Sequence, residues 1–181
     1  MPSRYARGTI NSLPSVHLEN ENISLSILPG VGAKIHDLIW KASGYNILWH
    51  NPRIRPQHYP IEANFDNYWC GGWDEGFPTW DACEHQGESY PNLGELRSVS
   101  WDIESLHENG NEAVAELSAF GPISPVRAVK TVTLSGPSES ADARPRSSHA
   151  QVPRWSLPIL TERAHRKRPS RSRPMGVRPW F

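Results

Sequence analysis

The chain of 181 residues carries 19 Lys and Arg against 19 Asp and Glu, so its formal net charge is zero. That balance hides two unlike parts, because residues 1–135 hold 16 acids and 9 bases whereas residues 136–181 hold 3 acids and 10 bases. The acidic first part argues against a nucleic-acid ligand, which needs clustered Lys and Arg. No apolar run of about 18 residues exists to form a transmembrane helix.

The N-terminal sequence favours a cytoplasmic protein, because the first residues lack the apolar core of a signal peptide. Cys70 and Cys83 could form a disulfide, but an intracellular chain would normally keep them as thiols. These cysteines and His85 lack a fourth ligand at the usual zinc spacing, and no glycine-rich nucleotide loop is present. We therefore expect neither a metal site nor a bound nucleotide.

The first predicted elements are strands of a meander. Residues 23–27 alternate between apolar and serine side chains, the pattern of a half-buried strand. The segment Pro-Gly-Val-Gly at 29–32 breaks the ladder. Further strands are expected at 33–40 and 45–50.

Residues 51–68 contain three prolines and predict an irregular connection into the segment 69–81, Trp-Cys-Gly-Gly-Trp-Asp-Glu-Gly-Phe-Pro-Thr-Trp-Asp. Three glycines and a proline exclude a helix there, and adjacent acids beside glycines do not suit a core strand. We expect a shaped loop that presents aromatic faces beside carboxylates, a combination that neutral sugars require. The alternative is an Ω-loop whose tryptophans cover the end of a sheet. Residues 81–95 are also predicted as loop.

Regular structure is predicted again from Arg97. Val99, Trp101 and Ile103 alternate with polar residues, which indicates a strand over about 97–104. The pair Asn109-Gly110 favours a tight hairpin turn, followed by strands at 113–120 and 126–134. Residues 1–135 are therefore predicted to be all-β.

Residues 136–181 have another character, with nine arginines, seven prolines and seven serines. This composition cannot form a packed core and predicts a disordered basic tail. A solvated linker, a tail that binds nucleic acid or an acidic surface, and an out-of-frame translation are the alternatives. The abrupt change of composition favours the last.

Ionisable side chains gather in and after the tryptophan-rich loop: Asp74, Glu75, Asp81, Glu84, His85, Glu88 and Glu95. Paired carboxylates could hydrolyse a glycoside, and a histidine with a carboxylate could move protons at a hemiacetal. A solvated acidic loop is the structural alternative. Spacing alone does not choose among them.

Three stretches resemble the galactose mutarotase-like (aldose 1-epimerase-like) family. They are ISLSILPGVGAKIHDLI at 23–39, Gly-Gly-Trp-Asp-Glu-Gly-Phe-Pro at 71–78, and Gly-Glu-Leu at 94–96 followed by Trp101. The resemblance covers about residues 16–134. It implies a β-sandwich, here truncated, with a sugar cleft on its concave face, action at the anomeric centre and no cofactor.

The resemblance also has limits that bear on the site. Asn92-Leu93 stands where family members often carry Asp-His. The family's glutamate base and histidine acid lie in a second half that has no matching residues here, so the catalytic residues are unknown and we expect little activity. His36 and His50 fall in predicted strands, where satisfied sheet residues are more common than ligands.

We therefore predict a carbohydrate-binding, aldose 1-epimerase-like protein whose residues 1–135 are the N-terminal portion of the sandwich. The expected partner is a small sugar, stacked on Trp73 and hydrogen-bonded by Asp74, Glu75, His85 and Glu95. The alternatives are a non-catalytic carbohydrate-binding module and a protein that acts through its basic tail. Exposed strand edges are expected to promote oligomerisation or aggregation.

Overall fold

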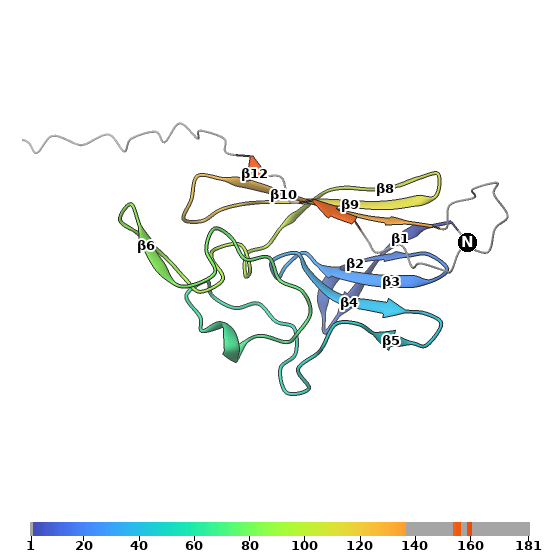
Figure 1. The fold of residues 1–181 in the computed structure, drawn as a ribbon, viewed down its shortest axis with the longest axis horizontal. Helices are drawn as coiled ribbons and strands as arrows, with labels where there is room; N and C mark the ends of the chain where they lie inside the picture. The colour runs from blue at the N-terminus through green and yellow to red at the C-terminus, as the bar shows by residue number, and fades with distance from the viewer. Residues whose placement is uncertain (1, 137–153, 157–158, 161–181) are drawn as a thin grey trace, which may run out of the picture.

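The computed structural model describes residues 2–136, 154–156 and 159–160 (Figure 1). These residues form antiparallel β-sheets and no α-helix, which confirms the all-β prediction. Two five-stranded sheets lie face to face as a β-sandwich, and long loops with a small hairpin extend from one end (Figure 1). No helix in these residues is long and apolar enough to cross a membrane.

The first sheet is an antiparallel meander in the order β1-β2-β3-β4-β5. Its strands are β1 (Arg4–Ile10), β2 (Leu13–Glu19), β3 (Ile23–Leu28), β4 (Lys34–Trp40) and β5 (Tyr45–Asn46). The predictions of β3 and β4 are confirmed. The strand predicted over 45–50 ends at Asn46, and His50 instead forms a bridge with Gly71 of the tryptophan-rich loop.

The hairpin β1–β2 has no counterpart among the predicted strands. β1 lies at the edge of the sheet and has no buried residue, so its sequence lacks the apolar alternation that marks a strand. The turn at Asn11-Ser12 has positive φ angles of 49° and 66°. Such angles suit a two-residue hairpin turn whose twist matches that of the strands.

The second sheet has the order β11-β10-β9-β8, and β12 also pairs with β10. Its strands are β8 (Asp102–Asn109), β9 (Glu112–Phe120), β10 (Arg127–Ser135), β11 (Arg154–Ser156) and β12 (Ile159–Leu160). β9 and β10 match their predictions. The hairpin turn is confirmed one residue later than predicted, because Asn109 pairs with Glu112 and leaves Gly110-Asn111 as the loop.

The strand predicted from Arg97 begins only at Asp102, so the prediction is wrong for residues 97–101. Val99 and Trp101 alternate as a strand would, but their backbone groups bond to the turn after β3. The amide of Gly32 donates to Val99 O at 2.9 Å, and the amide of Trp101 donates to Pro29 O at 2.9 Å. The alternation therefore reflects a buried irregular segment that packs against the first sheet.

The connection between the sheets contains η1 (Phe65–Asn67), a single 3-10 turn, and the hairpin β6 (Cys83–His85) and β7 (Glu88–Tyr90). The hairpin corrects the prediction of loop over 81–95. Only Tyr90 of its six residues is buried, so the sequence carries no apolar alternation there.

Only two short pieces of the segment 136–181 have a described fold, the strands β11 and β12 on the edge of β10. The rest of the predicted disordered tail, residues 137–153, 157–158 and 161–181, lies outside the described residues. The domain boundary at residue 135 stays a prediction.

The core fills the space between the two sheets. It is built from the inward faces of β2 and β3 on one side and of β9 and β10 on the other, with Leu96 and Trp101 between them. On β9 the small residues Ala113, Ala115 and Ala119 share the buried face of Leu117, as the alternation predicts. Burial of alternate residues from both layers fixes the register of each strand.

Replacement of a central core residue tests this packing. Leu25 of β3 is 1% exposed, and Leu25→Ala is expected to lower the free energy of unfolding by about 2–5 kcal/mol because it leaves a cavity. Urea unfolding followed by tryptophan fluorescence measures the loss. Ile47→Ala, at a residue 53% exposed, is the control and is expected to change it by no more than about 0.5 kcal/mol. Equal losses in the two variants would contradict the assigned core.

Candidate functional site

The segment 69–81 is a loop, as predicted, and its backbone is fixed against the first sheet. Trp73 exchanges two backbone hydrogen bonds with Ile35 of β4, at 2.8 and 3.1 Å. Gly71, at φ 90°, lies so close to the preceding chain that a Cβ there would be 2.1 Å from Trp49 O. The glycine is therefore required for the close approach of two backbone segments.

Two buried ion pairs hold the same loop from inside the sandwich. Asp74 Oδ2 lies 2.5 Å from Lys34 Nζ, and Glu75 Oε1 lies 2.7 Å from Lys130 Nζ. The side chains of Lys34 and Lys130 are 2% and 1% exposed. Asp74 and Glu75, predicted to accept hydrogen bonds from sugar hydroxyls, thus direct these oxygens at lysines in the interior.

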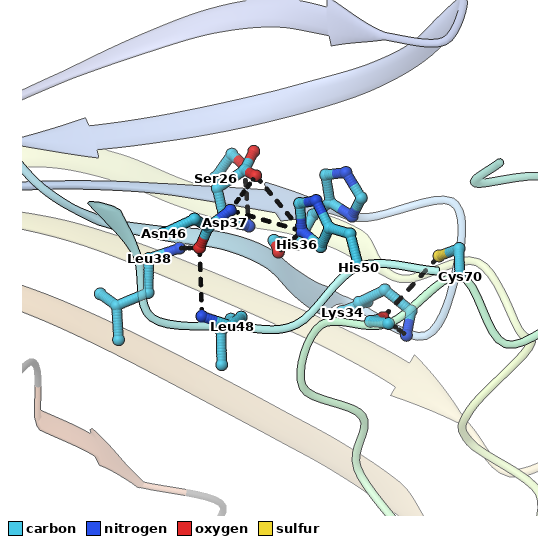
Figure 2. A network of polar contacts seen from close by, with 10 residues as sticks. Ser26, Lys34, His36, Asp37, Leu38, Asn46, Leu48, His50 and Cys70 are labelled. Atoms are coloured by element: carbon cyan, nitrogen blue, oxygen red, sulfur yellow. Dashed lines mark hydrogen bonds and ion pairs between the residues drawn. The ribbon is translucent and has the colours of Figure 1, made fainter. Parts of the chain in front are cut away.

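Each lysine also donates one hydrogen bond to a backbone carbonyl group. Lys34 Nζ donates to Gly71 O at 2.7 Å, next to the buried Cys70 thiol (Figure 2), and Lys130 Nζ donates to Ala33 O at 3.0 Å. Burial lowers the pKa of Lys130, whereas the neighbouring Glu75 carboxylate raises it. Burial also raises the pKa of the Cys70 thiol, which disfavours a reactive thiolate.

The tryptophans of the loop differ in exposure. Trp73 is 40% exposed and Trp80 is 69% exposed, so both present ring surface to solvent. The Trp80 ring covers Gly76, where a Cβ would lie 2.8 Å from the ring. Trp69 instead contacts Trp49 and Phe65, with ring centroids 5.2 and 5.9 Å away. The loop both covers the sheet and exposes aromatic faces.

A cavity of about 380 Å³ lies between the end of this loop and the hairpin β6–β7. Its walls combine apolar and aromatic surface with hydroxyl, carboxylate and imidazole groups: Pro78, Thr79, Cys83, Glu84, His85, Tyr90 and Ser124. Such a mixture is typical of small-molecule sites, where a few polar groups fix the orientation of a ligand.

Glu95 does not line the cavity but is hydrogen-bonded to the loop that carries Ser124. It is fully buried, and its carboxylate accepts hydrogen bonds from the backbone amides of Ile123 at 2.6 Å and Ser124 at 3.0 Å. The hydroxyl of Ser124 in turn lies 3.1 Å from Tyr90 Oη. Glu95 therefore positions the loop that carries Ser124, a role different from the direct sugar contact predicted for it.

The structure separates the five predicted site residues. His85 lines the cavity, and Glu95 holds the loop that carries Ser124. Trp73, Asp74 and Glu75 belong to the anchored part of the loop and do not line the cavity. Tyr90 and Ser124 were missed because nothing in their local sequence marks them. Within the described residues, Cys70, Cys83 and His85 do not form a group with metal-ligand spacing.

Loss of one partner from a buried ion pair is expected to be costly. Asp74→Ala leaves the Lys34 ammonium unpaired and is expected to lower the free energy of unfolding by about 3–5 kcal/mol. The double variant Lys34→Met/Asp74→Leu, with no charge left, is expected to recover most of this loss. The exposed pair Arg4–Glu19 is the control, and Arg4→Ala should cost no more than about 1 kcal/mol. Urea unfolding gives all three values, and a small effect of Asp74→Ala alone would refute the anchoring role.

No family profile matches the chain, and no curated protein does. Among solved structures, it is similar to YeaD of Salmonella typhimurium, a candidate mutarotase, with 12% identity and a TM-score of 0.48 over 72% of this chain and 47% of that one. HI1317 is 14% identical, with a TM-score of 0.47 over 75% of this chain and 52% of HI1317. For a galactose mutarotase-like protein of Clostridium acetobutylicum, the identity is 14% and the TM-score is 0.44, over 74% of this chain and 50% of that one. The chain thus spans about half the length of these structures.

Proposed function

We propose that this chain binds a neutral sugar in the cavity beside the hairpin β6–β7, as a carbohydrate-binding protein of the aldose 1-epimerase-like type. One observation carries the proposal, the composition of the cavity wall. Pro78 and Tyr90 supply apolar and aromatic surface for the carbon face of a sugar ring, and Thr79, His85 and Ser124 supply hydrogen-bonding groups for its hydroxyls.

The rigid support of the wall favours binding as well. Ser124 is held by the Glu95 carboxylate through its amide and by Tyr90 through its hydroxyl. The end of the loop is fixed on the other side, where the amide of Glu95 donates to Phe77 O at 2.6 Å. Groups that are already oriented lose less conformational entropy when a ligand binds.

Mutarotation is a second candidate function, favoured by one feature of the same cavity. Opening of a sugar ring requires a base at the anomeric hydroxyl and an acid at the ring oxygen. Glu84 and His85, a carboxylate and an imidazole, both line the cavity. The family resemblance assigns neither residue to catalysis, so this candidate rests on the cavity alone.

Sugar binding is tested by titration calorimetry of the full chain with glucose, galactose and mannose. His85→Ala and Ser124→Ala each remove a hydrogen-bonding group and are expected to raise Kd at least tenfold, about 1.4 kcal/mol, for a sugar that binds. His107→Ala, on exposed β8 surface outside the cavity, is the matched control and should leave Kd unchanged. Absence of binding in a folded protein, or equal affinity in all variants, would reject the proposed site.

Mutarotation is tested by polarimetry of freshly dissolved α-glucose or α-galactose. If Glu84 acts as base, the protein accelerates the change in rotation, and Glu84→Gln reduces the enzymatic part of the rate by about 10²-fold or more. His107→Ala should retain the full rate. A protein that binds the sugar but leaves the rate at that of buffer is a binding module without this activity.

A further inference from the structure

A second group of polar side chains lies where β4 meets the segment after β5, apart from the residues that line the cavity. His36 and Asp37 are adjacent on β4, and His50 reaches them from the neighbouring segment (Figure 2). One potential ligand atom from each residue lies within 4.8 Å of the other two. His36 is buried, whereas the side chains of His50 and Asp37 are 35% and 21% exposed, so the group lies at the edge of the interior and can be reached from solvent.

The Asp37 carboxylate is held in place by neutral partners. Ser26 donates its hydroxyl to Oδ2 at 2.5 Å, and Asn46 donates its amide to Oδ1 at 2.8 Å. Within the described residues, no Lys or Arg forms an ion pair with Asp37. The imidazole of His50 lies beside it, with Nε2 3.4 Å from Oδ1. A carboxylate fixed by outer hydrogen bonds, with no permanent cation beside it, has the character of a metal ligand.

His36 has a polar atom without a partner. The residue is only 7% exposed, and its Nδ1 atom is buried without a hydrogen-bond partner. Its ring stacks on that of His50, with centroids 4.2 Å apart and an angle of 10° between the planes. Buried polar atoms are nearly always satisfied, so an unpaired imidazole nitrogen beside a carboxylate requires an explanation.

The distance between the other two ligand atoms suits a small cation. Metal-to-ligand distances of about 2.0–2.1 Å in a tetrahedral zinc site place neighbouring ligand atoms about 3.3 Å apart. His50 Nε2 and Asp37 Oδ1, at 3.4 Å, already have this spacing. His50 Nε2 also lies 2.8 Å from His36 O, a bond it would give up together with its proton.

We propose that His36, Asp37 and His50 bind a divalent transition-metal ion of the zinc class, with water at the remaining position. Two imidazoles and one carboxylate are a ligand set that such ions accept, whereas Mg²⁺ and Ca²⁺ prefer oxygen ligands. Binding requires the two stacked rings to tilt until all three ligand atoms converge on one point. The ion would join β4 to the segment that carries Trp49.

The proposal is tested with the full chain, stripped with chelator and titrated with Zn²⁺ by calorimetry and with Co²⁺ by visible absorption. We expect one tight site for Zn²⁺, a Co²⁺ spectrum of a four- or five-coordinate ion, and no comparable binding of Mg²⁺. His50→Ala and the isosteric Asp37→Asn are expected to raise Kd for Zn²⁺ by at least 10–100-fold. His107→Ala, an exposed histidine on β8, is the control and should leave Kd unchanged.

A second measurement separates loss of the site from loss of the fold. Zn²⁺ should raise the Tm of the parent protein and of His107→Ala, because the ion binds the folded state, and should not raise that of Asp37→Asn. Circular dichroism without metal establishes that each variant is folded. Absence of a one-to-one site in the parent, or weak binding that Asp37→Asn and His50→Ala leave unchanged, would overturn the proposal.

Discussion

Two lysines from opposite sheets hold the loop 69–81 through consecutive carboxylates, and the candidate site depends on this arrangement. Lys34 begins β4 and pairs with Asp74, while Lys130 on the inner face of β10 pairs with Glu75. Charges at this depth are tolerated because they are paired and the lysines also bind carbonyl groups. The acids of the loop therefore act mainly as its supports, and the open cavity lies farther along the chain.

Sequence predicts most of the strands that contribute to the core, although β2, with its buried Val16 and Leu18, was not predicted. Strands β9 and β10 bury mainly the residues of one face, which is the pattern that the prediction uses. β3 shows the same alternation of apolar residues and serines, although all its residues except Ser24 are buried. Among the residues of β1, β6 and β7 only Tyr90 is buried, so their sequences show no alternation of apolar and polar residues. The alternation around Val99 and Trp101 predicts a strand that is not present. An irregular segment that packs against the first sheet can also bury every second residue.

The loop that carries the predicted site residues was recognisable from the sequence, but the direction of its side chains was not. Glycines, prolines and tryptophans over 69–81 indicate a shaped loop, and that loop is present. Which acids face inward depends on lysines far away in the chain, so local sequence could not separate Asp74 from Glu84. In the same way, the carboxylate of Glu95 is bound by the backbone amides of Ile123 and Ser124. These residues are distant in sequence, so the local sequence around Glu95 does not indicate its burial.

The link from Lys130 to Glu75 also affects how the molecule opens. If the loop 69–81 detached alone, it would leave two ammonium groups without counterions inside the sandwich, at a cost of several kcal/mol. Loop and sheets are therefore expected to unfold as one cooperative unit rather than by local fluctuation. Fraying is expected instead in β1, which has no fully buried residue and pairs with another strand on one side only.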